Sequence, residues 1–330
     1  LLPPADYPFS HWLSVHGQTA RALEAFWRPV VVSALNVQPE HASTAQALML
    51  FRDGFLRHRR AYELGLPMVP LSEIAEAARG YLESFGGRVV CRAAAAGIEV
   101  QRGAVSGVRL GDGRVVAADA YLSAVPPRAL LRLLPESVAA AAPFAGLRHL
   151  EYAAIVAAHL WFDRVVTRLD HAALVDRPVD WVFNKSRVNT RVRPYGLEGG
   201  TYLTLVVSAA ADLVRRPRAE ILKLALAEVR DALPEARAAG VVRALVNRHA
   251  EATFAPLPGC DRFRPGQVAP IPNLFLAGDW TRTGWPATME GAVRSGRLAA
   301  EAVLAAPGAR ETLLTPDLAV APLARVVGRW

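Results

Sequence analysis

The chain has 330 residues, of which 52% are hydrophobic and 21% are charged. This length allows about two domains, and the composition supports a large core and excludes a chain that is disordered throughout. The net charge of +8 comes almost entirely from arginine, because Lys185 and Lys223 are the only lysines.

The basic charge has two interpretations. Together with the abundant alanine, the excess of arginine is typical of a coding bias; the functional interpretation is attraction to an anionic membrane surface or to phosphate. No nucleic-acid motif occurs, so we expect no nucleic-acid partner. Cys91 and Cys260 have neither CxxC nor metal-ligand spacing, which favours a reducing compartment and predicts no metal site. We expect a cytoplasmic protein, with peripheral contact at the inner face of the membrane as the functional interpretation of the charge.

Residues 1–60 are predicted to be mostly helical. Apolar side chains recur at helical spacing over residues 10–27, Pro29 interrupts this helix, and a second amphipathic helix spans residues 42–56. His16 and Gln18 are polar residues among large apolar ones. They form either an exposed pair or polar contacts to a substrate.

The next stretch predicts a helix followed by strands and turns. Residues 71–85 form a helix that Gly86 and Gly87 end, and residues 88–91 form a strand. Residues 98–118 alternate apolar and polar side chains around two turns, the second with the hairpin sequence Asp-Gly. Residues 119–127 form a strand that stops at two prolines.

The middle of the chain predicts a mixed sheet with one packed face and one face that lines a cavity. Its strands and its covering helix are expected at residues 152–163, 180–184, 200–208, 241–253 and, for the helix, 217–233. An aromatic set lies on two of these strands, where it belongs either to the core or to the wall of an apolar cavity: Trp161, Phe162, Trp181 and Phe183.

The most informative stretch reads as strand, turn and helix. Residues 274–277 are continuously apolar, which is typical of a strand buried on both faces, and Gly278 and Asp279 follow its end. In open α/β sheets ligands bind at that edge. Thr288 is the expected N-cap of the next helix, whose N-terminus favours an anionic ligand. We expect the inward face of this helix to consist of Ala292, Val293, Gly296, Ala300 and Val303.

This segment resembles the C-terminal flavin-binding signature of the FAD-dependent amine oxidase and carotenoid desaturase superfamily. Within it, the chain most resembles the hydroxysqualene dehydroxylase family, also called squalene-associated FAD-dependent desaturases. The N-terminal sequences HGQ, FWRPVVVSALNVQPEHAS and FRDGFL also resemble this family, and they partly resemble plant-type phytoene desaturases. No GxGxxG fingerprint occurs, so the resemblance implies a fragment that lacks the first βαβ unit of the superfamily.

The resemblance implies an α/β fold in which a partial Rossmann-like FAD-binding domain is interleaved with an α+β substrate domain. The expected FAD-binding segments are residues 65–135 and 266–306; the expected substrate segments are the helical residues 1–64 and the sheet in residues 136–265. Residues 307–330 form a tail, either loosely packed, which we favour, or in contact with a membrane. The cofactor-binding residues implied are Ala95, Gly278, Asp279, Trp285, Thr288, Met289 and Glu290.

The activity implied is reduction of hydroxysqualene to squalene with FAD, on a hydrophobic isoprenoid substrate of squalene and hopanoid biosynthesis. Hydroxide is a poor leaving group, so the reaction needs a proton or a strong hydrogen bond, for which His16, Gln18 and Asn36 are the candidates. One alternative is a carotenoid-type desaturase that removes hydride from the isoprenoid. Another, of a different class, is a non-catalytic lipid-binding fragment that does not retain FAD.

Overall fold

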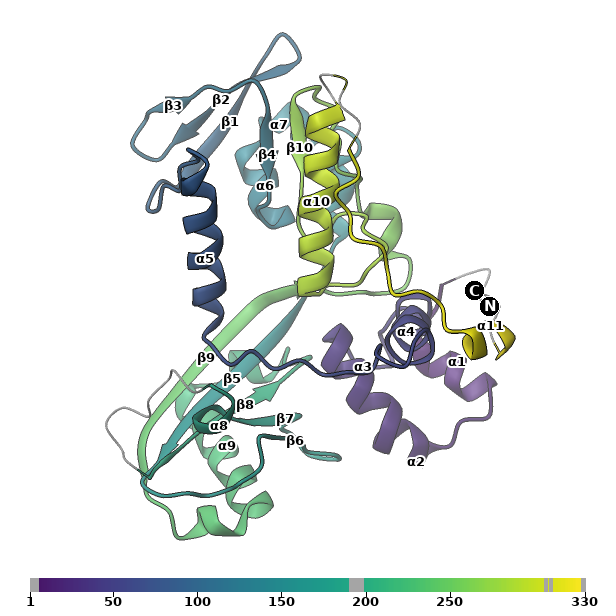
Figure 1. The fold of residues 1–330 in the computed structure, drawn as a ribbon, viewed down its shortest axis with the longest axis vertical. Helices are drawn as coiled ribbons and strands as arrows, with labels where there is room; N and C mark the ends of the chain where they lie inside the picture. Colours follow the sequence, from purple (N-terminus) through teal and green to yellow (C-terminus); the bar gives the residue numbers. More distant parts are fainter. Residues whose placement is uncertain (1–5, 190–198, 306–307, 309–310, 328–330) are drawn as a thin grey trace.

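The computed structural model describes residues 6–189, 199–305, 308 and 311–327. Figure 1 shows a helical lobe, a large sheet, and an α/β region that holds the long helix α10 (Met289–Ala305). The sheet's longest strands, β5 (Tyr152–Phe162) and β9 (Val241–Phe254), run from the sheet toward the α/β region (Figure 1). In that region β4 (Tyr121–Ser123) pairs in parallel with β10 (Leu274–Leu276), so segments far apart in the sequence form one unit.

The helical lobe is built from short helices that follow one another closely. They are α1 (Phe9–Val15), α2 (Ala20–Ala22), the π-helix η1 (Leu23–Trp27), α3 (Arg28–Leu35), α4 (Thr44–Phe51) and the π-helix η2 (Arg52–Leu56). The expected interruption at Pro29 is wrong: the break lies at Gly17, with φ of 69°. Pro29 sits in the first turn of α3, where the missing N–H of proline is tolerated.

The large sheet has the strand order β6-β7-β8-β5-β9. The predicted strands correspond to β5, β7 (Trp181–Asn184), β8 (Thr201–Val207) and β9, whereas β6 (His171–Ala173) was not predicted. The expectation of a mixed sheet is wrong, because every pairing among the described strands of this sheet is antiparallel. The predicted helix is α9 (Arg218–Ala232). It connects β8 to β9, and because β9 pairs with β5 rather than with β8, no parallel pair of strands forms.

One face of this sheet packs on α9 and the other carries most of the predicted aromatic set. Side chains alternate between faces along a strand, and directly opposed residues share a face. Trp161 opposes Tyr202 and Trp181 opposes Val206, so both tryptophans lie on the face away from α9. Phe162 lies on the other face, fully buried in the core with α9. The predicted aromatic set is therefore divided between the core with α9 and the opposite face of the sheet.

The predicted hairpins form the sheet β1 (Ala95–Gln101), β2 (Ala104–Leu110) and β3 (Val115–Val116). The preceding helix α5 (Leu71–Ser84) is also confirmed, although none of its residues is buried. The expected strand at residues 88–91 is wrong, since this stretch is irregular. Val89 and Val90 are exposed, and no described strand lies beside them to supply the hydrogen bonds that a strand needs.

The α/β region and the linker to it share one hydrophobic core. This core includes Leu130, Phe144, Phe254, Leu274 and Leu276. The remaining described elements are short: α6 (Pro127–Leu133), α7 (Glu136–Ala139), η3 (Phe144–His149), α8 (Lys185–Val188), η4 (Leu213–Arg215), η5 (Pro234–Arg237), η6 (Cys260–Phe263) and α11 (Pro322–Val327).

Within the expected tail, residues 307, 309–310 and 328–330 lie outside the described part. No helix in the described part of the chain has both the length and the apolarity that crossing a bilayer requires.

Candidate functional site

The strand, turn and helix predicted near the C-terminus form one compact site. β10 is buried along its whole length, and Asp279 follows it after Gly278. A β-carbon built on Gly291, in the first turn of α10, would lie 3.8 Å from the Cβ of Asp279. The carboxylate and the start of the helix are therefore neighbours.

Thr288 caps α10. Its hydroxyl accepts a hydrogen bond from the Gly291 N–H at 3.0 Å, and its carbonyl accepts one from the Ala292 N–H at 3.0 Å. Met289 and Glu290 precede these amides, and both are exposed. The first N–H groups of a helix have no partner within the helix and carry a partial positive charge, so this end of α10 can hold an anionic or electron-rich ligand.

Gly278 joins the strand to the helix through its backbone. Its φ of 126° suits glycine, and any side chain there would overlap the indole ring of Trp280. Its N–H donates to the hydroxyl of Ser295, at 2.7 Å, and that hydroxyl donates to the Ala292 carbonyl, at 2.6 Å. Ser295 is fully buried, so β10 and α10 are held together by a polar contact shielded from water.

The electrostatics of Asp279 suit a hydrogen-bond acceptor that awaits a partner. The side chain is half-buried, and burial raises the pKa of its carboxyl above the ordinary value. The backbone N–H of Trp280 and the charge of Arg264 act in the opposite direction on this pKa. Hydroxyl groups of a sugar-like ligand would stabilise the charged form, so the site fits the ribityl arm of the flavin that the sequence implies.

The expected inward face of α10 is wrong. The helix buries Gly291, Ser295 and Ala299, which recur every four residues. Val293 is 54% exposed, and a β-carbon on Gly296 would meet nothing within 4 Å. Small apolar residues occur on more than one side of this helix, and only its contact with β10 selects the buried side.

Two predicted residues lie around this junction in specific contacts. The indole of Trp285 is covered by the Arg294 guanidinium, whose carbon lies 5.7 Å from the ring centroid. Arg294 also pairs with Glu290, at 3.6 Å, and with Asp317, at 2.8 Å. Glu290 therefore has an ion-pair partner one turn along the same helix.

Ala95 and the candidate acids are placed elsewhere. Ala95 is exposed at the start of β1, opposite Leu110. His16 is exposed, with Nδ1 2.8 Å from the Trp12 carbonyl, and Gln18 accepts a hydrogen bond from the Trp27 indole at 2.9 Å. The strand-turn-helix thus gathers the other predicted cofactor-binding residues, and these three lie in the hairpin sheet or the helical lobe.

Asn36 differs from the other candidate acids because it is buried and lines a cavity. It ends α3 with a left-handed φ of 56°. Its Oδ1 accepts a hydrogen bond from the Ala209 N–H at 2.7 Å, and its Nδ2 donates to the Thr253 hydroxyl at 3.0 Å. A carboxamide nitrogen carries two hydrogens, so one donor of Asn36 remains for a ligand.

The cavity at Asn36 has a volume of about 600 Å³. Aliphatic side chains dominate its lining, among them Val37, Ala153, Ala209, Val214 and Leu257. Tyr152 also lines it, and burial raises the pKa of its hydroxyl. The hydroxyl accepts a hydrogen bond from the Arg128 N–H at 3.2 Å, which lowers this pKa, whereas the charge of Glu251 raises it.

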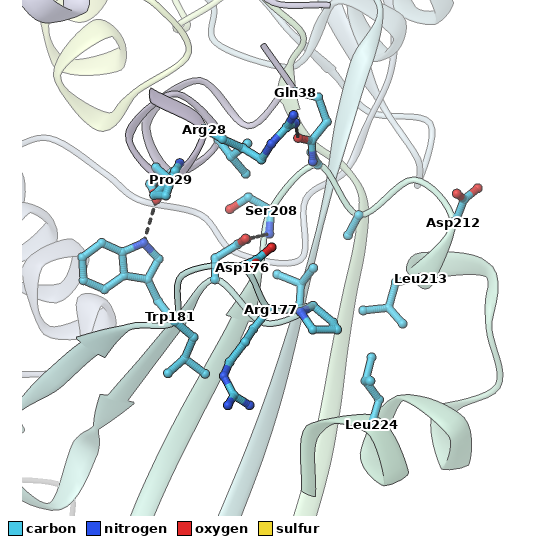
Figure 2. A pocket seen from close by; sticks show the side chains of 18 of the residues that line it. Arg28, Pro29, Gln38, Asp176, Arg177, Trp181, Ser208, Asp212, Leu213 and Leu224 are labelled. Atoms are coloured by element: carbon cyan, nitrogen blue, oxygen red, sulfur yellow. Dashed lines mark hydrogen bonds between the residues drawn. The ribbon is translucent and has the colours of Figure 1, made fainter. Parts of the chain in front are cut away.

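A second cavity, of about 620 Å³, lies between α3 and the ends of β7 and β8 (Figure 2). Arg28 and Arg177 line it, and each is already paired with two carboxylates. The Trp181 indole donates to the Ser33 hydroxyl at 2.6 Å and holds α3 to the sheet. With its many charged side chains, this cavity suits an apolar ligand less well than the one at Asn36.

Sequence reasoning missed a polar group on the open face of the sheet. His159 Nδ1 lies 2.9 Å from the Tyr202 hydroxyl and 3.2 Å from that of Thr204, and Nε2 lies 3.2 Å from the Asn247 amide nitrogen. Burial, and then the charge of Lys185, lower the pKa of His159. These four residues come from three strands, β5, β8 and β9, so only the sheet register brings them together.

It also missed Arg264, whose guanidinium lies behind the 279–285 turn and contacts its backbone. The signal in the sequence was slight: one arginine among many, in a segment rich in proline and glycine.

Comparison with known proteins identifies the family. The family described as flavin containing amine oxidoreductase matches residues 2–304. The chain is 31% identical to a hydroxysqualene dehydroxylase of Sinorhizobium fredii over 84% of its own length and 61% of that protein. It is 27% identical to a 15-cis-phytoene desaturase of Synechococcus elongatus over 91% of its own length and 65% of that protein. The chain thus spans about two thirds or less of these relatives.

Solved structures share the fold at low identity. An oxidoreductase from Methanosarcina mazei superimposes with a TM-score of 0.70 at 16% identity, covering 88% of this chain and 67% of that one. A putrescine oxidase bound to putrescine gives 0.70 at 16% identity, covering 90% and 68%. A reduced UDP-galactopyranose mutase gives 0.67 at 17% identity, covering 98% and 71%. From the match over almost its whole length, the chain belongs to the flavin containing amine oxidoreductase family.

Proposed function

We propose that this chain is the substrate-binding and C-terminal flavin-binding part of an FAD-dependent oxidoreductase that reduces hydroxysqualene to squalene. The observation that carries the proposal is the strand-turn-helix, in which Asp279 lies beside the first turn of α10, in a chain of the flavin containing amine oxidoreductase family. The cavity at Asn36, whose lining is largely aliphatic, supports an apolar substrate. A bound flavin supplies hydride-transfer chemistry, and the protein supplies position and electrostatics.

The residues proposed to hold the flavin follow from the strand-turn-helix. The Asp279 carboxylate would accept hydrogen bonds from ribityl hydroxyls, and the N–H groups at Met289 and Glu290 would stabilise an electron-rich group. Thr288 and Gly278 fix the two backbone segments, and Trp285 borders them. Ala95 stays a proposal for a backbone contact to the adenine.

The proposed domain organisation follows the interleaved path of the chain. Residues 65–135 and 266–306 form the flavin-binding part, and residues 1–64 and 136–265 form the substrate part, with a tail at 307–330. The parallel pairing of β4 with β10 supports the first grouping. The packing of Ala153 and Ala255 in one cluster with Phe9 and Leu35 supports the second, because this cluster ties the sheet to the helical lobe.

Asn36 is the strongest of the proposed groups that help the hydroxyl leave. Asn36 lines a cavity in which aliphatic side chains predominate, and its second amide hydrogen could donate to a substrate hydroxyl there. His16 and Gln18 remain weaker proposals, since both are exposed. None of the three has to be charged for this role.

A carotenoid-type desaturase is the second candidate. The 15-cis-phytoene desaturase of Synechococcus elongatus aligns over 91% of the chain, and a probable zeta-carotene desaturase of the same organism is 27% identical over 90%. The two functions differ in the direction of electron flow. Relatives of both kinds occur at similar identity, so the product of the reaction distinguishes the two functions.

We also propose a peripheral membrane contact at residues 55–64. Phe55, Leu56, Tyr62 and Leu64 are 39–66% exposed and surround the basic residues 57–60. Exposed apolar side chains beside arginines are typical of surfaces that bind anionic lipid. Salt-sensitive sedimentation with anionic vesicles, and none with neutral vesicles, is the expected result.

The decisive experiment uses the chain alone and the chain extended by a GxGxxG-containing βαβ unit at its N-terminus. Absorbance spectra first show which form retains FAD. That form then receives reduced FAD with hydroxysqualene and, separately, oxidised FAD with phytoene. Squalene supports the dehydroxylase and a desaturated product supports the second candidate. Tight binding of prenyl lipid with neither FAD nor turnover supports a non-catalytic lipid-binding protein and contradicts both.

A further inference from the structure

Arg264 is the most completely buried charged side chain near the proposed flavin site. The residue is 2% exposed, and its Nη2 lies within hydrogen-bonding distance of four oxygens. These are the backbone carbonyls of Asp279 (3.0 Å), Thr281 (2.7 Å) and Trp285 (2.7 Å), and the hydroxyl of Thr283 (3.4 Å). One guanidinium thus gathers the carbonyls of the turn that joins β10 to α10.

The other side of the guanidinium faces the helical lobe. Nη1 donates to Asp261 at 2.8 Å, and the guanidinium carbon lies 4.9 Å from the centre of the Phe254 ring. The Asp261 carboxylate in turn accepts from the Gln46 amide nitrogen, which is 2.9 Å from each of its oxygens. Gln46 lies on α4 and is 5% exposed.

We infer that Arg264 is a positioning residue that sets the turn around the proposed flavin site, and that Gln46 and Asp261 transmit the position of α4 to it. The inference rests on the proposed function for its flavin part. The helical lobe forms one wall of the apolar cavity through residues 36–41, so this chain of hydrogen bonds connects the substrate side to the cofactor side.

The chemistry of arginine explains why this residue type stands here. The guanidinium is planar, stays charged and presents its donors in a fixed fork, so it fixes several carbonyl groups at once. A lysine ammonium keeps the charge but lacks the fork. Two hydrogens on Nη2 serve four acceptors, which orients the peptide planes at residues 279, 281 and 285 toward one point.

The link from Gln46 can be separated from general packing. A second set of contacts also joins α4 to the η6 segment: Asp6 accepts from the Ser43 hydroxyl at 2.8 Å and from the Gly259 N–H at 2.8 Å. Replacing Gln46 by leucine keeps the side-chain size and leaves these contacts in place. Its effect therefore reports on the Asp261–Arg264 path.

The first test is hydrogen exchange in the chain without cofactor, using Arg264→Lys, Gln46→Leu, the double variant and a control. The control is Arg262→Lys, because Arg262 is exposed and its guanidinium lies on the Phe263 ring, 4.6 Å from the centroid. Arg264→Lys is expected to speed exchange at residues 281–291 about tenfold while β5 and β9 keep their protection. Gln46→Leu should speed it less, and add nothing in the Arg264→Lys background.

Equal exchange in the turn for Arg264→Lys and the control overturns the inference, as does a uniform increase over the whole chain. Additive effects in the double variant overturn the role of Gln46. The second test measures the FAD dissociation constant in the form that retains FAD, where Arg264→Lys should weaken binding about tenfold and the control should not. A looser turn with unchanged FAD affinity leaves Arg264 as structural support only. Failure of every form to bind FAD contradicts the proposed function, whereas the exchange data still decide what Arg264 does to the turn.

Discussion

Gly291 and Asp279 meet across the junction of α10 and β10. A β-carbon on Gly291 would lie 3.8 Å from the Cβ of Asp279 and 2.7 Å from the carbonyl oxygen of Pro286. The contact with Pro286 is closer than real side chains adopt, so the absence of a side chain at residue 291 allows the helix to start beside the carboxylate.

Gly291→Ala is therefore expected to destabilise the chain by about 1–3 kcal/mol, because the methyl group forces the Pro286 backbone to move. Gly296 lies in the same helix, and its β-carbon would meet nothing within 4 Å. Gly296→Ala should stabilise by about 0.5–1 kcal/mol through helix propensity alone. Urea unfolding of both variants checks this, and similar effects in the two would show that the close approach at residue 291 has no energetic consequence.

Asp279→Asn is expected to stabilise the cofactor-free chain at neutral pH. Burial raises the pKa of the Asp279 carboxyl, so the folded state holds its proton more tightly than the unfolded state does. The stability linked to this proton is fully present below the unfolded pKa and is lost as the pH rises through the folded pKa.

Melting temperatures measured between pH 4 and pH 8 test this sign. The gain in melting temperature from Asp279→Asn should be largest at pH 8 and should shrink toward pH 4. In the form that retains the cofactor, the same substitution should lower the affinity for FAD. An advantage that is constant with pH would mean that the charge of Asp279 has no part in it.

The two cysteines should differ sharply in reactivity. Cys91 is exposed, whereas Cys260 is buried, and burial, followed by the charge of Asp261, raises the pKa of its thiol to about 12. A disulfide exchange reagent at pH 8 should react with one thiol in the folded chain and with both after denaturation, because the thiolate is the nucleophile. Cys91→Ser should abolish the reaction of the folded chain; fast reaction in that variant would contradict the burial of Cys260.

Asn36→Ala is expected to cost about 1–3 kcal/mol, because it leaves the buried Ala209 N–H without its acceptor. Asn36→Gly loses the same hydrogen bonds but tolerates the left-handed φ of 56°, so it should cost about 1 kcal/mol less. Chemical denaturation separates the two variants. If Asn36 also serves the substrate, turnover falls in both to a similar extent despite the difference in stability; turnover that follows stability would argue for a purely structural role.

Elements whose signals are local could be predicted from the amino-acid sequence. The apolar run before Gly278, the cap at Thr288 and the hairpin at residues 111–113 each depend on neighbouring residues, and each is present as expected. The strands β5, β7, β8 and β9 of the large sheet followed from the same kind of pattern. The family resemblance added the flavin, which no spacing of residues shows.

Features that depend on a partner distant in the sequence could be recognised only in the folded chain. Residues 88–91 have the composition of a strand but find no described neighbour to pair with. α10 buries Gly291, Ser295 and Ala299 because β10 lies against that side, although its pattern also fits the opposite one. The role of Arg264 arises only in the folded chain. The fold brings acceptors of the 279–285 turn within about 3 Å of its guanidinium and links it to α4.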